Sequence, residues 1–314
     1  MNALTDLLRL CCLPLLGWAA VRDVRTRRVP DRTWLPLLAL GGALLAWDVS
    51  SVLRGTRPLD TGVFALRVVI SLGVVAPLGL LFWRVGAFGG ADAKALAVLC
   101  LLFPSVPAYQ FSNVALPLAE TSGVFSLTVL TNAALVGGTA PVYLFARNAL
   151  AGRFTPESFV GRPVRWRELP NTHGRLLARA NGLDGGFDLD ALRLYLCWRG
   201  ASLERLRATP DRSRDPTSLP EERPAPDDGA IDPFADGGER ADLWAAAAFL
   251  DAVEGNAYGT TPARLRAALD ALVARDRLWV TPGIPFLVPL FVGLCLALVY
   301  GDLLYAAMGA FGLL

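Results

Sequence analysis

RVGAFGGADAK, residues Arg84 to Lys94, is a short polar stretch between two long apolar runs. It places Asp92 directly behind two glycines and at the start of an apolar segment, and it contains Lys94, the only lysine of the sequence. An acid at the edge of a hydrophobic segment is either a helix cap or a functional group. We hypothesise that Asp92 is one half of a catalytic pair, that Asp23 is the other half, and that the fold brings them together.

The composition around this stretch indicates a membrane protein. Hydrophobic residues make up 54% of the 314 residues, and the mean hydropathy is +0.43. The apolar residues cluster in runs long enough to cross a bilayer. A formal net charge of +2 gives no indication of a nucleic-acid partner, and the five cysteines form no CxxC pair that would indicate zinc or a disulfide framework. The lipid bilayer is therefore the first expected partner.

The apolar runs predict an all-α polytopic membrane protein with six transmembrane helices. Residues 1–150 are expected to hold the first five spans and both acids, and residues 282–314 the last span and an apolar tail. Basic residues follow the first apolar run instead of preceding it, so we expect a retained first span and not a cleaved signal peptide. The expected spans are residues 4–21, 34–47, 63–83, 93–109, 124–150 and 284–300.

Residues 151–281 are predicted to be a small, mostly helical domain inserted before the last span. One helix is expected after Asp188 as a cap and before Gly200 as a stop, and another begins at Thr261 and Pro262. Residues 278–282 are typical of a short strand. Residues 208–241 are rich in Pro, Asp, Glu and Gly, which predicts a disordered acidic linker whose binding partner is open.

The distribution of basic residues predicts the topology. With six spans, the loops 22–33 and 84–92 and the inserted domain lie on one side of the membrane. The first of these loops contains five arginines, whereas the loop 48–61 on the opposite side has only Arg54 and Arg57. Short loops rich in arginine and lysine stay in the cytoplasm. The sequence therefore predicts that Asp23, Asp92 and the insert face the cytoplasm and that the N-terminus lies outside.

Two carboxylates that face each other in a helix bundle can share a proton, because two like charges at close range do not both ionise cheaply. One can then act as general base on a water molecule and the other as general acid, which is aspartic-protease chemistry. The run Gly89, Gly90 and Ala91 removes side-chain bulk, so that a substrate backbone could approach.

Other interpretations of the two acids stay open at this point. Asp92 could simply cap a helix, and Asp23 could be an interface residue paired with a nearby arginine. The protein could also be a transporter or channel that uses Asp23 and Asp92 as ion ligands, in which case acids near the bilayer midplane are expected. A non-catalytic membrane scaffold is a third possibility.

Three segments resemble the prepilin peptidases. Asp23, followed by Arg28-Val29-Pro30, resembles the first active-site motif of that family. Gly89-Gly90-Ala91-Asp92 fits the second, which reads Gly, any residue, a hydrophobic residue, Asp. The segment 279–289 is similar to the entry to the last span in archaeal preflagellin and prepilin peptidases, and parts of the insert are similar to haloarchaeal members.

The resemblance implies a membrane aspartic endopeptidase. Such an enzyme removes the short basic leader, a class III signal peptide, from archaellin and type IV pilin-like precursors at the cytoplasmic membrane face. It implies Asp23 and Asp92 as the catalytic pair, Gly89 as the motif glycine, and a mechanism without metal or cofactor. Position 91 is alanine where many bacterial relatives have glycine, although the archaeal pattern allows any hydrophobic residue there. The oligomeric state is not indicated.

Overall fold

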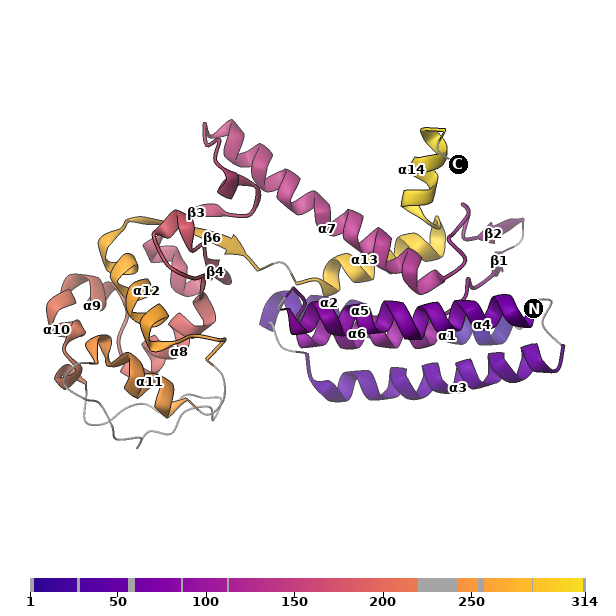
Figure 1. Ribbon diagram of the computed structural model, residues 1–314, viewed down its shortest axis with the longest axis horizontal. Helices are drawn as coiled ribbons and strands as arrows, with labels where there is room; N and C mark the ends of the chain where they lie inside the picture. The colour runs from indigo at the N-terminus through magenta and orange to yellow at the C-terminus, as the bar shows by residue number, and fades with distance from the viewer. Residues whose placement is uncertain are drawn as a thin grey trace. The chain divides into compact units, whose positions relative to one another are not determined.

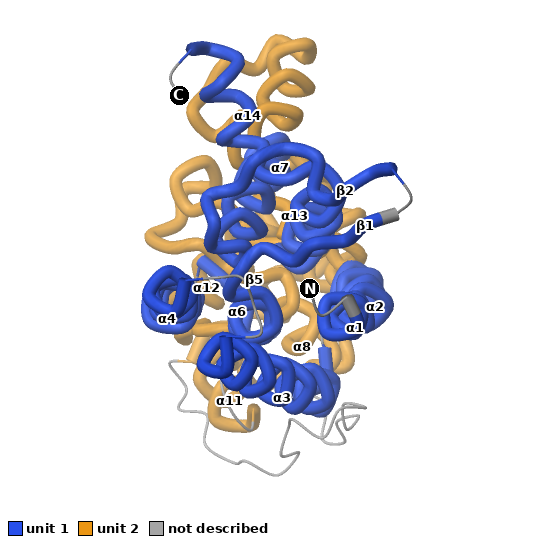
Figure 2. The backbone as a smooth tube through the Cα atoms, turned by 90° about the vertical axis from the view of Figure 1, so that its right-hand side faces the viewer, with its two compact units in different colours: residues 1–140, 285–314 blue, residues 141–284 orange. Residues whose placement is uncertain are grey.

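The computed structural model describes residues 3–26, 29–55, 60–85, 87–111, 113–219, 242–253, 257–283 and 285–312. Arg28 of the first motif and residues 220–241 of the expected linker lie outside these ranges. The chain divides into two compact units, coloured separately in Figure 2: unit 1 comprises Met1–Ala140 and Pro285–Leu314, and unit 2 comprises Pro141–Ile284.

Unit 1 is a bundle of helices with one short hairpin (Figure 1). Its elements are α1 (Ala3–Arg9), α2 (Cys12–Thr26), a 3-10 turn η1 (Asp31–Thr33), α3 (Trp34–Leu53), α4 (Thr61–Ile70), a π-helical turn η2 (Ser71–Val75), α5 (Ala76–Arg84), α6 (Gly90–Leu102), β1 (Tyr109–Phe111), β2 (Val114–Leu116), the first part of α7 (Phe125–Leu150), α13 (Leu287–Val299) and α14 (Leu303–Ala310).

Helix α6 is the buried centre of this bundle. Its residues Ala95, Leu96 and Leu99 are all 0% exposed. Glycines on the neighbouring helices let those helices approach it closely. A Cβ at Gly79 of α5 would lie 2.9 Å from Leu96 Cδ2, and one at Gly41 of α3 would lie 3.0 Å from Leu101 Cβ. The backbone of α6 therefore has neighbours at close range on more than one side.

The number of membrane spans differs from the prediction of six. By length and composition, four described helical segments can cross a membrane, namely Leu4–Thr26, Asp31–Leu53, Thr61–Arg84 and Phe125–Leu150. The pair α13 and α14, bent by 63°, would make a fifth. The expected fourth span ends early, because the chain leaves the helix at Phe103 just before Pro104 and Pro107. The 13 residues of α6 are fewer than the roughly 20 that a bilayer requires.

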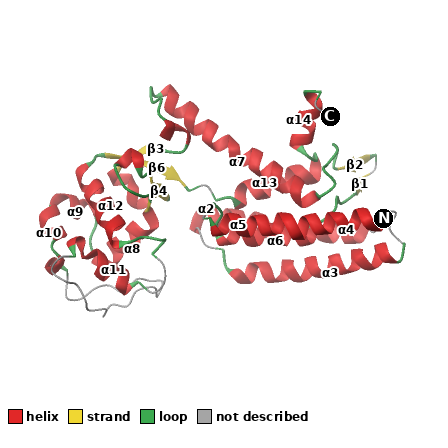
Figure 3. Cartoon of the chain, in the orientation of Figure 1, coloured by secondary structure: helices red, strands yellow, loops and turns green. Residues whose placement is uncertain are grey.

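Unit 2 is a mixed helix and strand unit, not the mostly helical domain that the sequence predicted. Figure 3 shows its strands beside the helices. The strands β3 (Arg162–Arg165), β4 (Gly174–Leu176), β5 (Phe187–Asp188) and β6 (Arg277–Pro282) form an antiparallel sheet in the order β3-β6-β4-β5. The helices are α8 (Leu189–Arg199), α9 (Leu203–Ala208), α10 (Pro210–Arg214), α11 (Ala246–Ala252) and α12 (Pro262–Ala274), with short 3-10 turns η3 (Pro156–Phe159), η4 (Trp166–Asn171), η5 (Arg179–Asn181), η6 (Pro216–Ser218) and η7 (Leu243–Ala245).

Local signals in unit 2 were interpreted correctly where a cap or stop defines an element. The Asp188 carboxylate accepts the Asp190 N–H at the start of α8, and Gly200 ends that helix at φ 63°. Thr261 caps α12, whose first residue is Pro262. In contrast, α10 and η6 occupy residues 210–218, which the sequence analysis had assigned to a disordered linker. The high charge and proline content suggested disorder, but both elements begin at a proline, which is favourable in the first turn of a helix.

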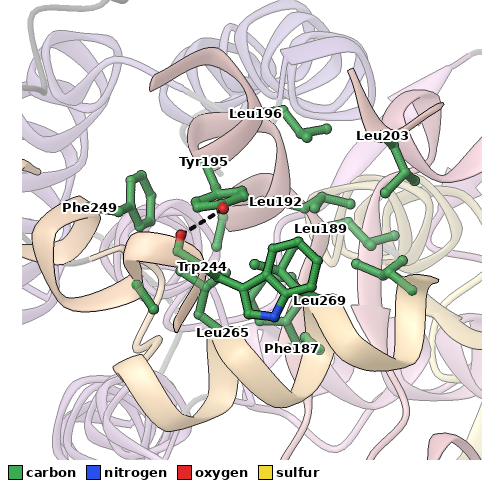
Figure 4. Close-up of a cluster of buried hydrophobic side chains, with 14 of the residues drawn as sticks. Phe187, Leu189, Leu192, Tyr195, Leu196, Leu203, Trp244, Phe249, Leu265 and Leu269 are labelled. Carbon is green, nitrogen blue, oxygen red and sulfur yellow. Dashed lines mark hydrogen bonds between the residues drawn. The ribbon is translucent and has the colours of Figure 1, made fainter. Parts of the chain in front are cut away.

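The core of unit 2 joins α8, α11 and α12 around aromatic side chains (Figure 4). The Tyr195 hydroxyl donates to the Trp244 carbonyl at 2.8 Å, and its ring meets Phe249 edge to face at 5.4 Å. The buried Arg199 guanidinium donates to the same Trp244 carbonyl at 3.2 Å and to the Ser213 carbonyl at 2.6 Å. Residues on both sides of the segment 220–241 are therefore bound to one side chain.

Candidate active site

Asp23 lies in the last turns of α2 and continues its buried face. Cys12, Leu16, Ala19, Ala20 and Asp23 are the buried residues of this helix, and their spacing is that of one helical stripe. Asp23 is only 8% exposed. An acid at the end of an apolar stripe points the same way as the stripe, so its carboxylate faces the interior of unit 1.

Asp92 is the third residue of α6 and is 7% exposed. Its Oδ2 accepts the backbone N–H of Gly89 at 2.8 Å, and Gly89 is the residue that precedes the helix. The capping interpretation is thus partly correct. The carboxylate accepts the N–H of Gly89, but Asp92 is the third residue of the helix and not the residue that precedes it.

The start of α13 lies beside the turn that contains Asp23. A Cβ at Gly17 of α2 would lie 3.2 Å from Phe291 Cζ, and Cys12 lies near Cys295. Later residues of α13 therefore pack against earlier residues of α2, so the two helices are antiparallel. Because both helices rise 1.5 Å per residue, the first turn of α13 falls next to the last turns of α2.

The segment before Asp92 reaches the same place. The Phe88 ring stacks on Phe286, the residue preceding α13, with centroids 4.3 Å apart. On another side of the site, Lys94 Nζ donates to Asp31 Oδ1 at 2.5 Å, which ties the first turns of α6 to the chain that follows α2. The last turns of α2, which contain Asp23, and the first turn of α6, which contains Asp92, therefore lie at the same end of unit 1, opposite the end where α1 begins (Figure 1).

The other residues of the second motif have distinct surroundings. A Cβ at Gly89 would lie 3.1 Å from the Asp92 Oδ2, which is tighter than ordinary contact, whereas one at Gly90 would lie 3.6 Å from Trp83 Nε1. Ala91 is partly buried against the apolar core of unit 1. Of these three motif residues, Gly89 is the one whose lack of a side chain leaves room for the Asp92 carboxylate. Lys94, whose side chain is 46% exposed, forms an ion pair with Asp31.

A buried ionic cluster at the opposite end of unit 1 was missed by the sequence analysis. The Arg9 guanidinium pairs with both Asp6 and Asp48, and its Nε donates to the Leu102 carbonyl at 2.7 Å. Asp48 is 0% exposed, although the sequence analysis had placed it in a polar loop. The spacing of Asp6 and Arg9 inside an apolar segment was an available signal, but Asp48 is far away in sequence. This cluster fastens α1, α3 and the end of α6 far from Asp92.

Comparisons with known proteins identify the family. Residues 10–142 match the model of the type IV leader peptidase family, and residues 245–303 match that of the archaeal peptidase A24 C-terminus, type II. Together the two matches cover more than half of the chain, and the first includes Asp23 and Asp92. The chain belongs to the archaeal branch of the type IV prepilin peptidase family, peptidase A24.

The chain is also similar to a curated relative, the prepilin peptidase EppA of Methanothermobacter thermautotrophicus. The two are 30% identical over 124 residues, which is 38% of this chain and 29% of that protein. The match therefore spans less than a third of the length of the relative.

Proposed function

We propose that this protein is a membrane aspartic endopeptidase that removes class III signal peptides from archaellin and type IV pilin-like precursors, with Asp23 and Asp92 as its catalytic pair. Membership of the prepilin peptidase family supports the reaction class. The observation that supports the assignment to residues is the position of two buried acids at helix ends, Asp23 in the last turns of α2 and Asp92 in the first turn of α6.

In the proposed mechanism, one carboxylate takes a proton from a water molecule whose oxygen attacks the scissile carbonyl carbon. The resulting tetrahedral intermediate collapses when the other, protonated carboxyl gives its proton to the leaving amine, and the C–N bond breaks. The pair begins the next cycle with one shared proton, because two close carboxylates do not both ionise cheaply. The Gly89 N–H, bound to Asp92 Oδ2, would hold that carboxylate in a fixed orientation.

The rival transporter function has less support in the structure. It expects acids near the middle of membrane spans, where ions are bound at broken helices. Asp23 instead lies in the last turns of α2 and Asp92 in the first turn of α6. Acids at helix ends suit a substrate that arrives from the membrane surface.

We further propose that the end of unit 1 with both acids faces the cytoplasm and that the N-terminus lies outside. Arg22, Arg25, Arg84 and Lys94 belong to this end of the bundle, and short basic segments stay inside. The chain leaves unit 1 after Ala140 and re-enters it at Pro285. Gly137 and Pro289 lie close to these two points, and a Cβ at Gly137 would be 3.7 Å from Pro289, so the chain leaves and re-enters at the same end. Unit 2 would accordingly be cytoplasmic.

The test is cleavage of a pre-archaellin by membranes that contain each variant. Asp23→Asn and Asp92→Asn should each lower the rate roughly a thousandfold, because each removes one proton-transfer group. Glu120→Gln is the control, since Glu120 is an exposed acid of unit 1 that lies beside Asp302, after the far end of α13. Processing by either of the first two variants at the parental rate would refute the assignment.

A further inference from the structure

Unit 2 has a basic surface pocket that the proposed peptidase mechanism does not use. Its volume is about 390 Å³, and it is lined by Arg165, Trp166, Arg167, Asp276 and Arg277. The three arginines are exposed, at the point where β3 ends and β6 begins. The pocket therefore presents guanidinium groups to the solvent from two strands.

The sheet register places two of these arginines directly opposite each other. Arg165 pairs with Arg277 in the antiparallel ladder, next to the pair Val164 and Leu278. Val164 and Leu278 are 2% and 0% exposed, so their burial fixes the register and turns both arginines to the outer face. Directly opposed like charges destabilise a strand pair. The strand pair thus holds two positive charges together at a cost in stability.

The acid in the pocket does not neutralise them. Asp276 Oδ1 accepts from Arg207 Nη2 at 2.9 Å, and Arg207 also donates to the Arg275 carbonyl at 2.6 Å. In the described part of unit 2, no carboxylate forms an ion pair with Arg165, Arg167 or Arg277. These three guanidinium groups therefore give the pocket an excess of positive charge.

The aromatic side chain is not available for stacking. The Arg207 guanidinium lies 4.7 Å from the centroid of the Trp166 ring, and that of Arg167 lies 5.2 Å from it. Two cations thus already contact the indole, which disfavours an aromatic ligand such as a nucleobase. What the pocket offers is charge and planar pairs of N–H donors.

We propose that this pocket binds a phosphate group. Guanidinium forks match phosphate oxygens in two parallel hydrogen bonds, and an anion between Arg165 and Arg277 would turn their repulsion into attraction. The phosphate could belong to a lipid headgroup or to a free phosphate compound. The chemistry at the pocket is the same for both, and the site is independent of the peptidase activity.

The test is calorimetric titration of the full chain in a non-ionic detergent, at about 0.15 M salt to suppress unspecific attraction. Inorganic pyrophosphate represents free phosphate, and dihexanoylphosphatidylglycerol represents the lipid headgroup. At least one of the two should bind saturably, and whichever binds more tightly identifies the source. Arg277→Gln should weaken that binding roughly tenfold or more, because it removes a charge-assisted pair of hydrogen bonds. Arg277→Lys should retain part of the affinity.

The control removes the same number of charges elsewhere in unit 2. Arg179, Arg205 and Arg212 are exposed and outside the pocket, and replacing all three with Gln should leave the affinity nearly unchanged. Replacing Arg165, Arg167 and Arg277 with Gln should abolish it. A second signature needs no ligand: Arg277→Gln alone should raise the unfolding temperature, because it relieves the Arg165–Arg277 repulsion. Absence of saturable binding of both probes, or equal loss in both triple variants, would overturn the proposal.

Discussion

At the residue scale, Gly89 determines how the Asp92 carboxylate can lie. A Cβ at this position would be 3.1 Å from Asp92 Oδ2, so Gly89→Ala should push the carboxylate away from its hydrogen bond. We expect cleavage of a pre-archaellin to fall about a hundredfold, the effect of a small misplacement of a reacting group. Gly90→Ala is the control, because its Cβ would meet Trp83 Nε1 at an ordinary 3.6 Å. Equal rates for the two variants would contradict this role of Gly89.

The Tyr195 hydroxyl makes the stability of unit 2 sensitive to alkali. Burial raises the pKa of Tyr195 to about 12, although the nearby Arg199 guanidinium opposes that shift. Since the tyrosine pKa in an unfolded chain is about 10, the folded protein holds this proton more tightly. The stabilisation is complete below about pH 10 and is lost as the pH rises through about 12.

The comparison with Tyr195→Phe isolates this group. At pH 7 the variant should be about 1 kcal/mol less stable, because the hydrogen bond to the Trp244 carbonyl is lost. Above pH 10 its unfolding midpoint, followed by tryptophan fluorescence, should fall less steeply than that of the parent. Parallel curves for the two proteins over that range would show that Tyr195 does not titrate as described.

The two acids of the site could be found from the sequence, but their surroundings could not. Asp92 follows Gly89-Gly90-Ala91 at the start of an apolar run, and Asp23 follows another apolar run, so each position has a local signal. Phe286 and Asp31, which contact Phe88 and Lys94, are set by long-range packing. Contacts between residues so far apart in the sequence leave no local pattern from which they could be predicted.

At the element scale, close approach of α7 and α13 depends on Gly293. A Cβ at Gly293 would lie 2.6 Å from the backbone N of Ala133, which cannot move without shifting α7. We expect Gly293→Ala to destabilise unit 1 by about 1–3 kcal/mol, the usual cost of overpacking. Gly42→Ala should be neutral or mildly stabilising, because no atom lies within 4 Å of its Cβ position and alanine favours a helix. Thermal unfolding in detergent measures both, and equal midpoints would contradict this packing.

The strand expected at residues 278–282 is confirmed as β6, but its partner strands were not predicted, for a physical reason. The start and end of α8 and α12 depend on caps and stops within a few residues. Strand β3 pairs with β6, more than a hundred residues away, and its four residues have no alternating pattern of their own. The length of α6 was overestimated because apolar residues continue past Leu102, whereas Pro104 and Pro107 end the helix.

At the scale of the whole molecule, the arrangement of unit 1 predicts which parts of the chain share a membrane side. In a cysteine-free background, Glu204→Cys in unit 2 and Glu120→Cys before α7 place single thiols at exposed positions. A membrane-impermeant maleimide should label Cys at 120 in intact cells, but at 204 only after the cells are opened. The reason for this expectation is the excess of basic residues at the end of the bundle that holds Asp23 and Asp92, because short basic segments stay in the cytoplasm. Labelling of position 204 in intact cells would invert the topology.

The central claim is that Asp23 and Asp92 act as one catalytic unit, and a double-variant cycle tests it most directly. Rates of pre-archaellin cleavage would be measured for Asp23→Asn, Asp92→Asn and the protein with both substitutions. If the two residues act as a unit, one substitution already removes the function of the pair, and the second removes nothing more. The double variant should therefore be no slower than the slower single variant. Losses that multiply in the double variant, or a single variant that cleaves at the parental rate, would contradict the account.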